Sequence, residues 1–186
     1  MKTLVISGYR AQEIGIFKSD DPAVRIIKKA IRQRVEPLIE EGLEWVIVSG
    51  GLGIEQWAAE EVIQMKRDHA QIQLAVITPF LNQQEKWNEE NQNKYQNILK
   101  SADFTASVSN KSYTDPSQFK NRDDLLLRKA DGLLIVYDEE KDGSPGFLVK
   151  KAKNYAETDK LEIMYINFQD LQWIADEEAL NEIEPD

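Results

Sequence analysis

Five short runs of consecutive apolar residues constrain the fold of this chain more than any other feature. They cover residues 4–6, 45–48, 74–77, 133–137 and 163–166, and a weaker candidate covers 104–108. Continuous apolar runs of this length are typical of strands that are buried on both faces, whereas half-exposed strands alternate. The pattern therefore predicts a parallel sheet with a layer of helices on each side.

Amphipathic helical patterns separate these runs. The first begins at Asp21 and Pro22, an N-cap followed by proline, and Gly42 ends it. Pro37 lies inside this pattern and predicts a kink or a separate last turn. Further helices are expected over residues 54–65, 83–99, 116–130, 145–156 and 171–184, with Trp57 and Trp87 in the core. We predict one doubly wound, mainly parallel α/β domain of Rossmann-like type over residues 1–186, with an acidic C-terminal segment from about residue 170.

The composition excludes several kinds of chemistry. The chain has 186 residues, no cysteine, one histidine and a formal net charge of −10. Thiol nucleophiles and Cys/His metal sites are therefore excluded, and no metal is expected. An acidic chain repels a phosphate backbone, so we expect nucleic acid to be an unlikely partner. No signal peptide or membrane span is expected, which fits a cytoplasmic protein.

A glycine-rich turn after the second apolar run is the strongest local signal. Gly50, Gly51 and Gly53 lie between that run and a helix, where free backbone N–H groups and the helix dipole favour an anion such as phosphate. The alternative is that the glycines only make a tight turn. The segment is neither a dinucleotide fingerprint, since Gln56 stands where a third glycine is needed, nor a P-loop.

Glu55 follows this turn in the first turn of the helix. A carboxylate there is stabilised by the helix dipole, and in one interpretation this is its whole role. In the functional interpretation it binds a ribose hydroxyl or a base amino group beside the phosphate.

Other candidate residues follow the ends of the strands, where open parallel sheets bind ligands. Arg10 and Arg122 are candidate anion clamps, and Tyr9 and Phe80 are candidate stacking walls for a base. The remaining candidates are Ser7, Gly8, Ile54, Gln56, Asn121, Asp138, Ser144 and Gly146. A basic stripe on the first helix (Arg25, Lys28, Lys29, Arg32) is expected to be a solvent-exposed face.

These strand ends resemble the YpsA family, within the wider group of DprA-like and LOG-like Rossmann proteins. The resemblance rests on residues 7–10 and 15–17, on 49–58 and on Thr78-Pro79-Phe80. Residues 119–122 and 130–136 are also similar to a segment of DprA, and Gly143-Ser144 to its Ser-Gly-Ser turn. The resemblance implies a pocket for a nucleotide or a nucleotide-derived ligand, no required cofactor, and a link to cell division or growth control, with cell-division proteins as partners.

The resemblance also leaves two alternatives open. The first is an N-glycosidase or phosphoribohydrolase of LOG type, but the alignment puts Trp57 at the position of the LOG catalytic glutamate. Glu55 is then the only candidate acid/base. The second is a DprA-like module that binds single-stranded DNA. The sequence favours a non-catalytic regulator that binds a small nucleotide-type anion, and it sets neither the identity of the ligand nor the oligomeric state.

Overall fold

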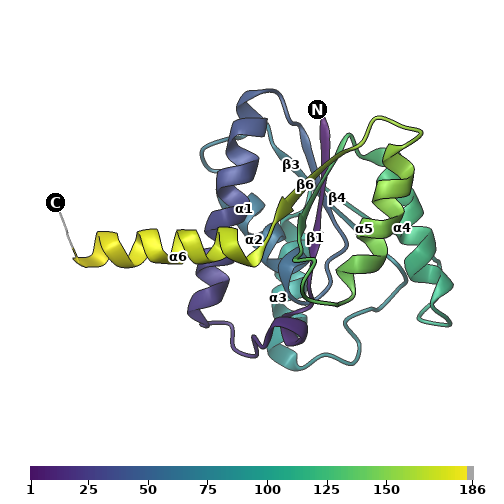
Figure 1. The fold of residues 1–186 in the computed structure, drawn as a ribbon. Coiled ribbons are helices and arrows are strands. Elements are labelled where there is room, and N and C mark those ends of the chain that lie inside the picture. The colour runs from purple at the N-terminus through teal and green to yellow at the C-terminus, as the bar shows by residue number, and fades with distance from the viewer. Residues whose placement is uncertain (184–186) are drawn as a thin grey trace.

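The computed structural model describes residues 1–183 and contains a six-stranded sheet whose paired strands are all parallel (Figure 1). The order is β4-β3-β2-β1-β5-β6. The strands are β1 (Thr3–Gly8), β2 (Trp45–Val48), β3 (Gln73–Thr78), β4 (Phe104–Ser107), β5 (Gly132–Val136) and β6 (Glu162–Ile166). Chain direction across the sheet reverses at β1, which confirms the prediction of a doubly wound Rossmann-like α/β fold.

The helices begin and end largely where the capping residues predict. They are the 3₁₀-helix η1 (Ala11–Ile14), α1 (Pro22–Glu40), α2 (Ile54–Met65), α3 (Glu89–Ser101), α4 (Ser117–Lys129), α5 (Pro145–Ala156) and α6 (Phe168–Ile183). The carboxylate of Asp21 accepts a 2.9 Å hydrogen bond from the amide of Ala23 and caps α1.

Helix α1 runs through Pro37 to Glu40, so the separate last turn, one of the two outcomes predicted from Pro37, is wrong, whereas the predicted end before Gly42 is confirmed. Two predicted helix boundaries are also wrong. Helix α3 begins after Asn88, whose side chain caps it, so residues 83–88 form turns instead of its first turns. Helix α6 begins at Phe168, three residues before the predicted start, and the predicted end at residue 184 lies outside the described residues.

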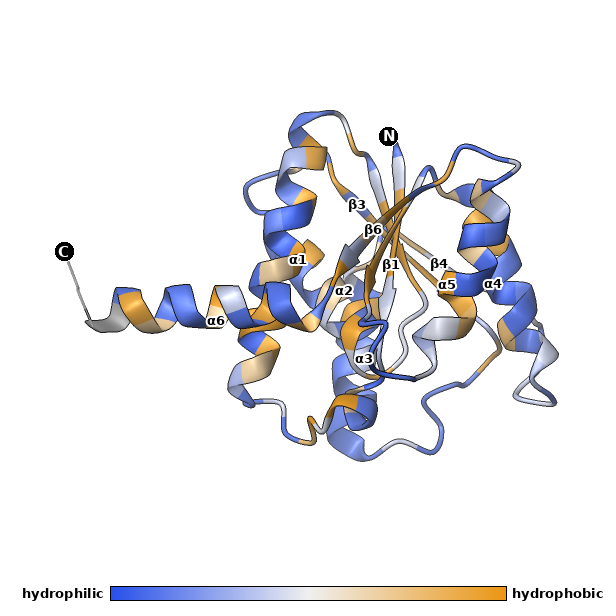
Figure 2. Ribbon diagram, viewed as in Figure 1, coloured by the Kyte–Doolittle hydropathy of each residue, from blue (hydrophilic) through white to orange (hydrophobic). Residues whose placement is uncertain are grey.

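Alternating residues of the strands supply two hydrophobic cores, one on each face of the sheet. Leu4, Ile6 and other residues of that face pack against α1, α2 and α3, whereas Val5 and its neighbours pack against α4 and α5. Figure 2 shows the resulting pattern, with hydrophobic strands at the centre and hydrophilic residues along the outer faces of the helices.

The basic stripe of α1 is not a plain solvent-exposed face, contrary to the prediction. Lys28 and Arg32 pair with Glu60 and Glu61 of α2, both at 2.5 Å. Arg25 and Lys29 pair with Glu178 of α6 at 2.9 and 3.4 Å. The stripe therefore joins three helices, and it holds α6 across α1 although the far end of α6 projects from the body (Figure 1). None of the helices within residues 1–183 has the length and hydrophobicity that crossing a bilayer requires.

Candidate ligand-binding cleft

A cleft of about 860 Å³ opens at the carboxyl ends of β1, β2 and β3. Its walls come from the segment after β1, from the glycine turn and first turns of α2, and from the segments around Phe80, Trp87 and Phe119. This volume lies in the range of pockets that hold small-molecule ligands. The cleft is therefore the principal candidate for a binding site.

The glycines of the turn are required by the backbone and by close packing. Gly50 and Gly53 have φ angles of +76° and +105°, which side chains with a Cβ rarely adopt. A Cβ atom on Gly53 would lie 2.4 Å from the amide nitrogen of Ala11. The turn after β2 is thus pressed directly against the backbone after β1.

The carboxylate of Glu55 folds back over this turn. Its Oε1 accepts a hydrogen bond of 2.9 Å from the hydroxyl of Ser7, and its Oε2 accepts one of 2.9 Å from the amide of Gly51. A Cβ on Gly51 would lie 2.9 Å from the same Oε2. Glycine at position 51 therefore makes room for a carboxylate that links the ends of β1 and β2 inside the cleft.

Some backbone amides of the predicted phosphate-binding turn already donate hydrogen bonds to groups of the protein. The Gly51 amide donates to Glu55, and the Ile54 amide donates to the carbonyl of Tyr9 at 3.2 Å. Within residues 1–183, the amides of Glu55 and Gln56 in the first turn of α2 have no hydrogen-bond acceptor. These two amides lie at the positive end of the helix dipole.

Two arginines lie around the ring of Phe119. The guanidinium carbon of Arg122 is 5.5 Å from the ring centroid and that of Arg10 is 6.0 Å from it. Arg122 is held by Asp123 at 2.6 Å and by the hydroxyl of Ser49 at 3.1 Å. Arg10 is exposed and makes no ion pair with a side chain of residues 1–181, although its positive charge contributes to the lowered pKa of Glu13. The first arginine is fixed and largely neutralised, whereas the second stays exposed at the rim of the cleft.

A second carboxylate occupies the glycine turn before α5. Glu13 accepts hydrogen bonds of 2.7 Å from the amide of Ser144, from its hydroxyl and from the amide of Arg10. Burial raises the pKa of Glu13, but these hydrogen bonds outweigh it and leave the pKa below its ordinary value. The polar groups of Ser144 are therefore engaged by Glu13.

The cleft brings together only part of the predicted site. The predicted residues that border it are Ser7, Gly8, Tyr9, Arg10, Gly51, Gly53, Glu55, Gln56, Phe80, Arg122 and Ser144. Tyr9 is only 1% exposed because its ring packs on Tyr137 and Phe168, so it offers no stacking wall.

Five predicted residues do not border the cleft. Ile54 is fully buried in the core, and Gly50 lies beneath the side chains of Gln83 and Tyr95. Asn121 is exposed on α4 and does not line the cleft. The carboxylate of Asp138 accepts hydrogen bonds from the amides of Glu140 and Phe168. A ligand in the cleft would meet none of these four, nor Gly146.

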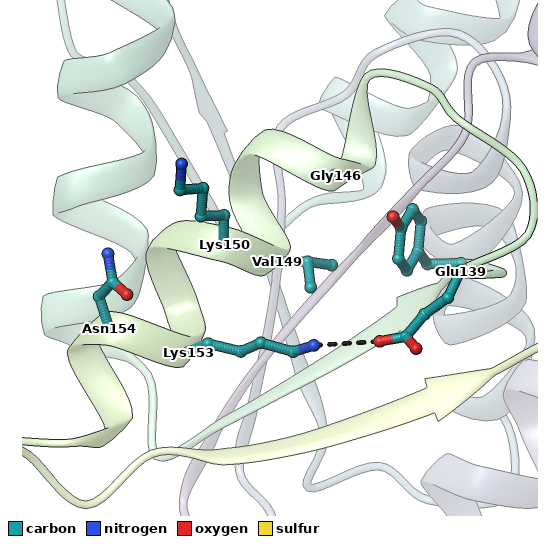
Figure 3. A pocket seen from close by; sticks show the side chains of 7 residues that line it. Glu139, Gly146, Val149, Lys150, Lys153 and Asn154 are labelled. Atoms are coloured by element: carbon teal, nitrogen blue, oxygen red, sulfur yellow. Dashed lines mark hydrogen bonds and ion pairs between the residues drawn. The ribbon is translucent and has the colours of Figure 1, made fainter.

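Gly146 instead lines a separate hollow of about 330 Å³ beside α5 (Figure 3). Lys153 of that hollow reaches Glu139 at 3.0 Å, so its charge is already paired (Figure 3). Among the residues that line the hollow, the charged ones are Glu139, Lys150 and Lys153. Tyr137 is the one aromatic residue among those that line it, whereas several aromatic side chains line the cleft.

The sequence analysis missed several residues of the cleft. Trp57 and Trp87, predicted as core, are half-buried and line it. Phe119 and Gln83 line it as well, and the Gln83 amide donates to the carbonyl of Ser49 at 2.9 Å. Phe119 stands three residues before Arg122, in the segment that resembles DprA, so its spacing on α4 and that resemblance were the available signals.

Comparison with known proteins identifies close relatives of the chain. The model of the YpsA family, described as the YspA SLOG family, matches residues 4–171. A UPF0398 protein of Halalkalibacterium halodurans is 44% identical over 98% of this chain and 96% of its own length. Another, from Brevibacillus brevis, is 48% identical over 96% of this chain and 95% of its own length.

A solved structure shares the fold. DNA processing protein A (DprA) from Helicobacter pylori, described by its single-stranded DNA binding mode, matches with a TM-score of 0.54 at 18% identity. The match covers 87% of this chain and 64% of that chain. At this identity the likeness shows a common fold.

This likeness overturns the expectation that nucleic acid is an unlikely partner. That expectation rested on the net charge of −10, yet the related fold belongs to a protein described as binding single-stranded DNA. Net charge is an average over the whole surface and does not describe one cleft. Around the cleft, Lys28, Lys94 and Arg122 are balanced by Glu60, Glu90 and Asp123, and Arg10 and Lys18 make no ion pair within residues 1–183.

Proposed function

The chain belongs to the YpsA SLOG family, and on that premise we propose that its cleft binds a nucleotide or a nucleotide-derived ligand without transforming it. The observation that carries the proposal is the carboxylate of Glu55, held by Ser7 and Gly51 inside a cleft that also contains the unpaired Arg10. A regulatory role in cell division or growth control is supported only by the family resemblance.

The carboxylate and the cation suit different parts of a nucleotide. A carboxylate only accepts hydrogen bonds, so Glu55 repels phosphate and attracts the hydroxyls of a sugar or an amino group of a base. The planar fork of a guanidinium matches phosphate oxygens, so Arg10 takes the phosphate. A ligand with hydroxyls next to a phosphate satisfies both groups at once.

Calorimetric titration of the purified protein with ribonucleoside 5′-monophosphates tests this proposal. We expect saturable binding and a ligand-dependent rise in thermal stability. The variant Arg10→Ala should lose roughly tenfold or more in affinity, because a charge-assisted contact is removed. The control variant is Arg128→Ala, because Arg128 is also an exposed arginine but lies on α4 outside the cleft. It should bind the nucleotides as the unsubstituted protein does.

The same samples distinguish binding from catalysis. Chromatography after incubation should return the nucleotide intact. Release of free base would instead make the chain an N-glycosidase, with Glu55 as the acid/base. Absence of any binding to the unsubstituted protein would contradict the proposed function.

Single-stranded DNA is a second candidate ligand, favoured by the likeness to DNA processing protein A. Fluorescence anisotropy with a labelled single-stranded oligonucleotide at low salt tests it. Binding there should weaken as salt increases, since phosphate contacts release counterions. Competition of a nucleoside monophosphate with the oligonucleotide would place both in the same cleft.

A further inference from the structure

Three aromatic side chains gather at one wall of the cleft. The ring centroid of Phe80 lies 5.3 Å from that of Tyr113 and 5.4 Å from that of Phe119, and Tyr113 lies 6.1 Å from Phe119. They come from the segment after β3, from the loop before α4 and from α4 itself. Phe80 and Phe119 line the cleft, whereas Tyr113 does not line it and is 53% exposed.

This cluster is not part of the hydrophobic core. None of its three members belongs to either core cluster of the described residues, and Phe80 and Phe119 are only half-buried. Aromatic rings left partly exposed in a cleft lose the free energy that full burial provides. A ligand that covers them restores it.

The only cations in contact with Phe119, among residues 1–183, are Arg10 and Arg122. The Arg10 contact of 6.0 Å is at the outer limit of a cation–π interaction, and Arg10 is exposed and makes no ion pair there. Arg10 can therefore leave the ring at little cost, or cover a flat group placed on it. Arg122, fixed by Asp123 and Ser49, stays in place.

We infer that Phe119, supported by Phe80 and Tyr113, is the stacking surface for the base of the ligand. This inference rests on the proposed function. It adds a contact for the base to the contacts already proposed for the phosphate and the sugar. Every nucleobase has a π-face that stacks on an aromatic ring, so the surface accepts different bases. In this arrangement the sugar, which joins the base to the phosphate, meets Glu55, and the phosphate meets Arg10.

The test compares ligands with and without a base. The four ribonucleoside 5′-monophosphates and ribose 5-phosphate are titrated by calorimetry against the unsubstituted protein and Phe119→Leu. Loss of a stacked base costs roughly five- to a hundredfold in affinity. We therefore expect Phe119→Leu to lower the affinity for the nucleotides by about tenfold or more and to leave the affinity for ribose 5-phosphate unchanged. Phe119→Tyr should bind the nucleotides as the unsubstituted protein does.

A matched control and the contradictory outcomes keep the two proposals separate. Phe147→Leu changes an 81% exposed phenylalanine on α5 and should affect no ligand. If the nucleotides bind but Phe119→Leu lowers their affinity no more than it lowers the affinity for ribose 5-phosphate, the stacking inference is wrong and the proposed function stands. If neither nucleotide nor sugar phosphate binds to the unsubstituted protein, the proposed function itself is wrong. Thermal denaturation of each variant verifies that it is folded.

Discussion

Single residues set the shape of the cleft, and Gly53 is the most constrained of them. Its φ of +105° disfavours any side chain, and the space for a Cβ is closed by rigid backbone. The backbone after β1 and the turn after β2 can approach one another only because this position has no side chain. The cleft therefore depends on a contact between two backbones.

Gly53→Ala should lower the free energy of unfolding by roughly 2 kcal/mol or more, because both strain and a clash with Ala11 are introduced. Gly15→Ala is the matched control, since Gly15 also has a positive φ of +71° but open space around its Cβ. Urea denaturation of both variants measures the difference, and equal losses would contradict the close approach.

The carboxylate of Glu13 makes stability depend on pH. Its folded-state pKa is lowered, so it stabilises the fold above its unfolded pKa of about 4.3, and this contribution is lost as the pH falls through the folded pKa. Glu13→Gln should therefore cost about 1 kcal/mol or more at pH 7 and progressively less below about pH 4.

Urea denaturation across this pH range measures the effect. Glu162→Gln serves as the control, because Glu162 is exposed on β6 and its side chain makes no hydrogen bond or ion pair within residues 1–183. A stability difference for Glu13→Gln that stays constant from pH 7 to pH 3 would show that its hydrogen bonds do not depend on the charge.

At the scale of elements, the pairing of α1 with α2 and α6 has energetic consequences. Arg32 pairs with both Glu36 and Glu61, at 2.8 and 2.5 Å, and Glu61 is largely buried. Arg34, two residues on, has its carboxylate partner Asp170 only at 3.7 Å. The same helix thus carries one tightly paired and one loosely paired arginine.

Arg32→Ala should cost about 1 kcal/mol more than Arg34→Ala, since exposed, loose ion pairs contribute little and both changes have the same effect on helix propensity. Urea denaturation measures both, and 1 M salt should reduce the difference. Equal losses at low salt would mean that the α1–α2 pairs do not stabilise the fold.

Most elements could be predicted from the sequence because their signals are local. Strands that are buried on both faces appear as continuous apolar runs, and Asp21-Pro22 marks the start of α1. The start of α3 could not be predicted in this way, because Trp87 fits the helical spacing although Asn88 caps the helix. Local periodicity does not show which of two possible caps is used.

The contacts that define the site could not be predicted, because they join residues far apart in the chain. The turn at Gly51 was recognisable, but the bond between Glu55 and Ser7 spans 48 residues. The position of Phe119 against Phe80 depends on the packing of α4 beside the segment after β3. Conversely, Asp138 and Gly146 follow a strand end as binding residues do, yet they serve other parts of the fold.

At the scale of the whole molecule, the cleft extends away from the point where the strand order reverses, although Ser144 and Pro145 beyond β5 still border it. Parallel sheets of this kind usually bind ligands between the two strands at that point, here β1 and β5. The space is filled by Tyr9, whose hydroxyl donates to the carbonyl of Lys141 at 2.6 Å and accepts from the amide of Asp138 at 3.2 Å. The open cleft lies instead toward β2 and β3.

Tyr9→Phe should therefore destabilise the whole fold by roughly 1–3 kcal/mol, because a carbonyl and an amide in the loop after β5 lose their partner while the ring packing is kept. Tyr137→Phe is the matched control: its ring stacks on Tyr9 at 5.9 Å, but its hydroxyl makes no hydrogen bond within residues 1–183. Thermal and urea denaturation measure both. If Tyr9→Phe proves as stable as Tyr137→Phe, the hydroxyl does not join the two halves of the sheet, and the filled space between β1 and β5 depends on the packing of the ring alone.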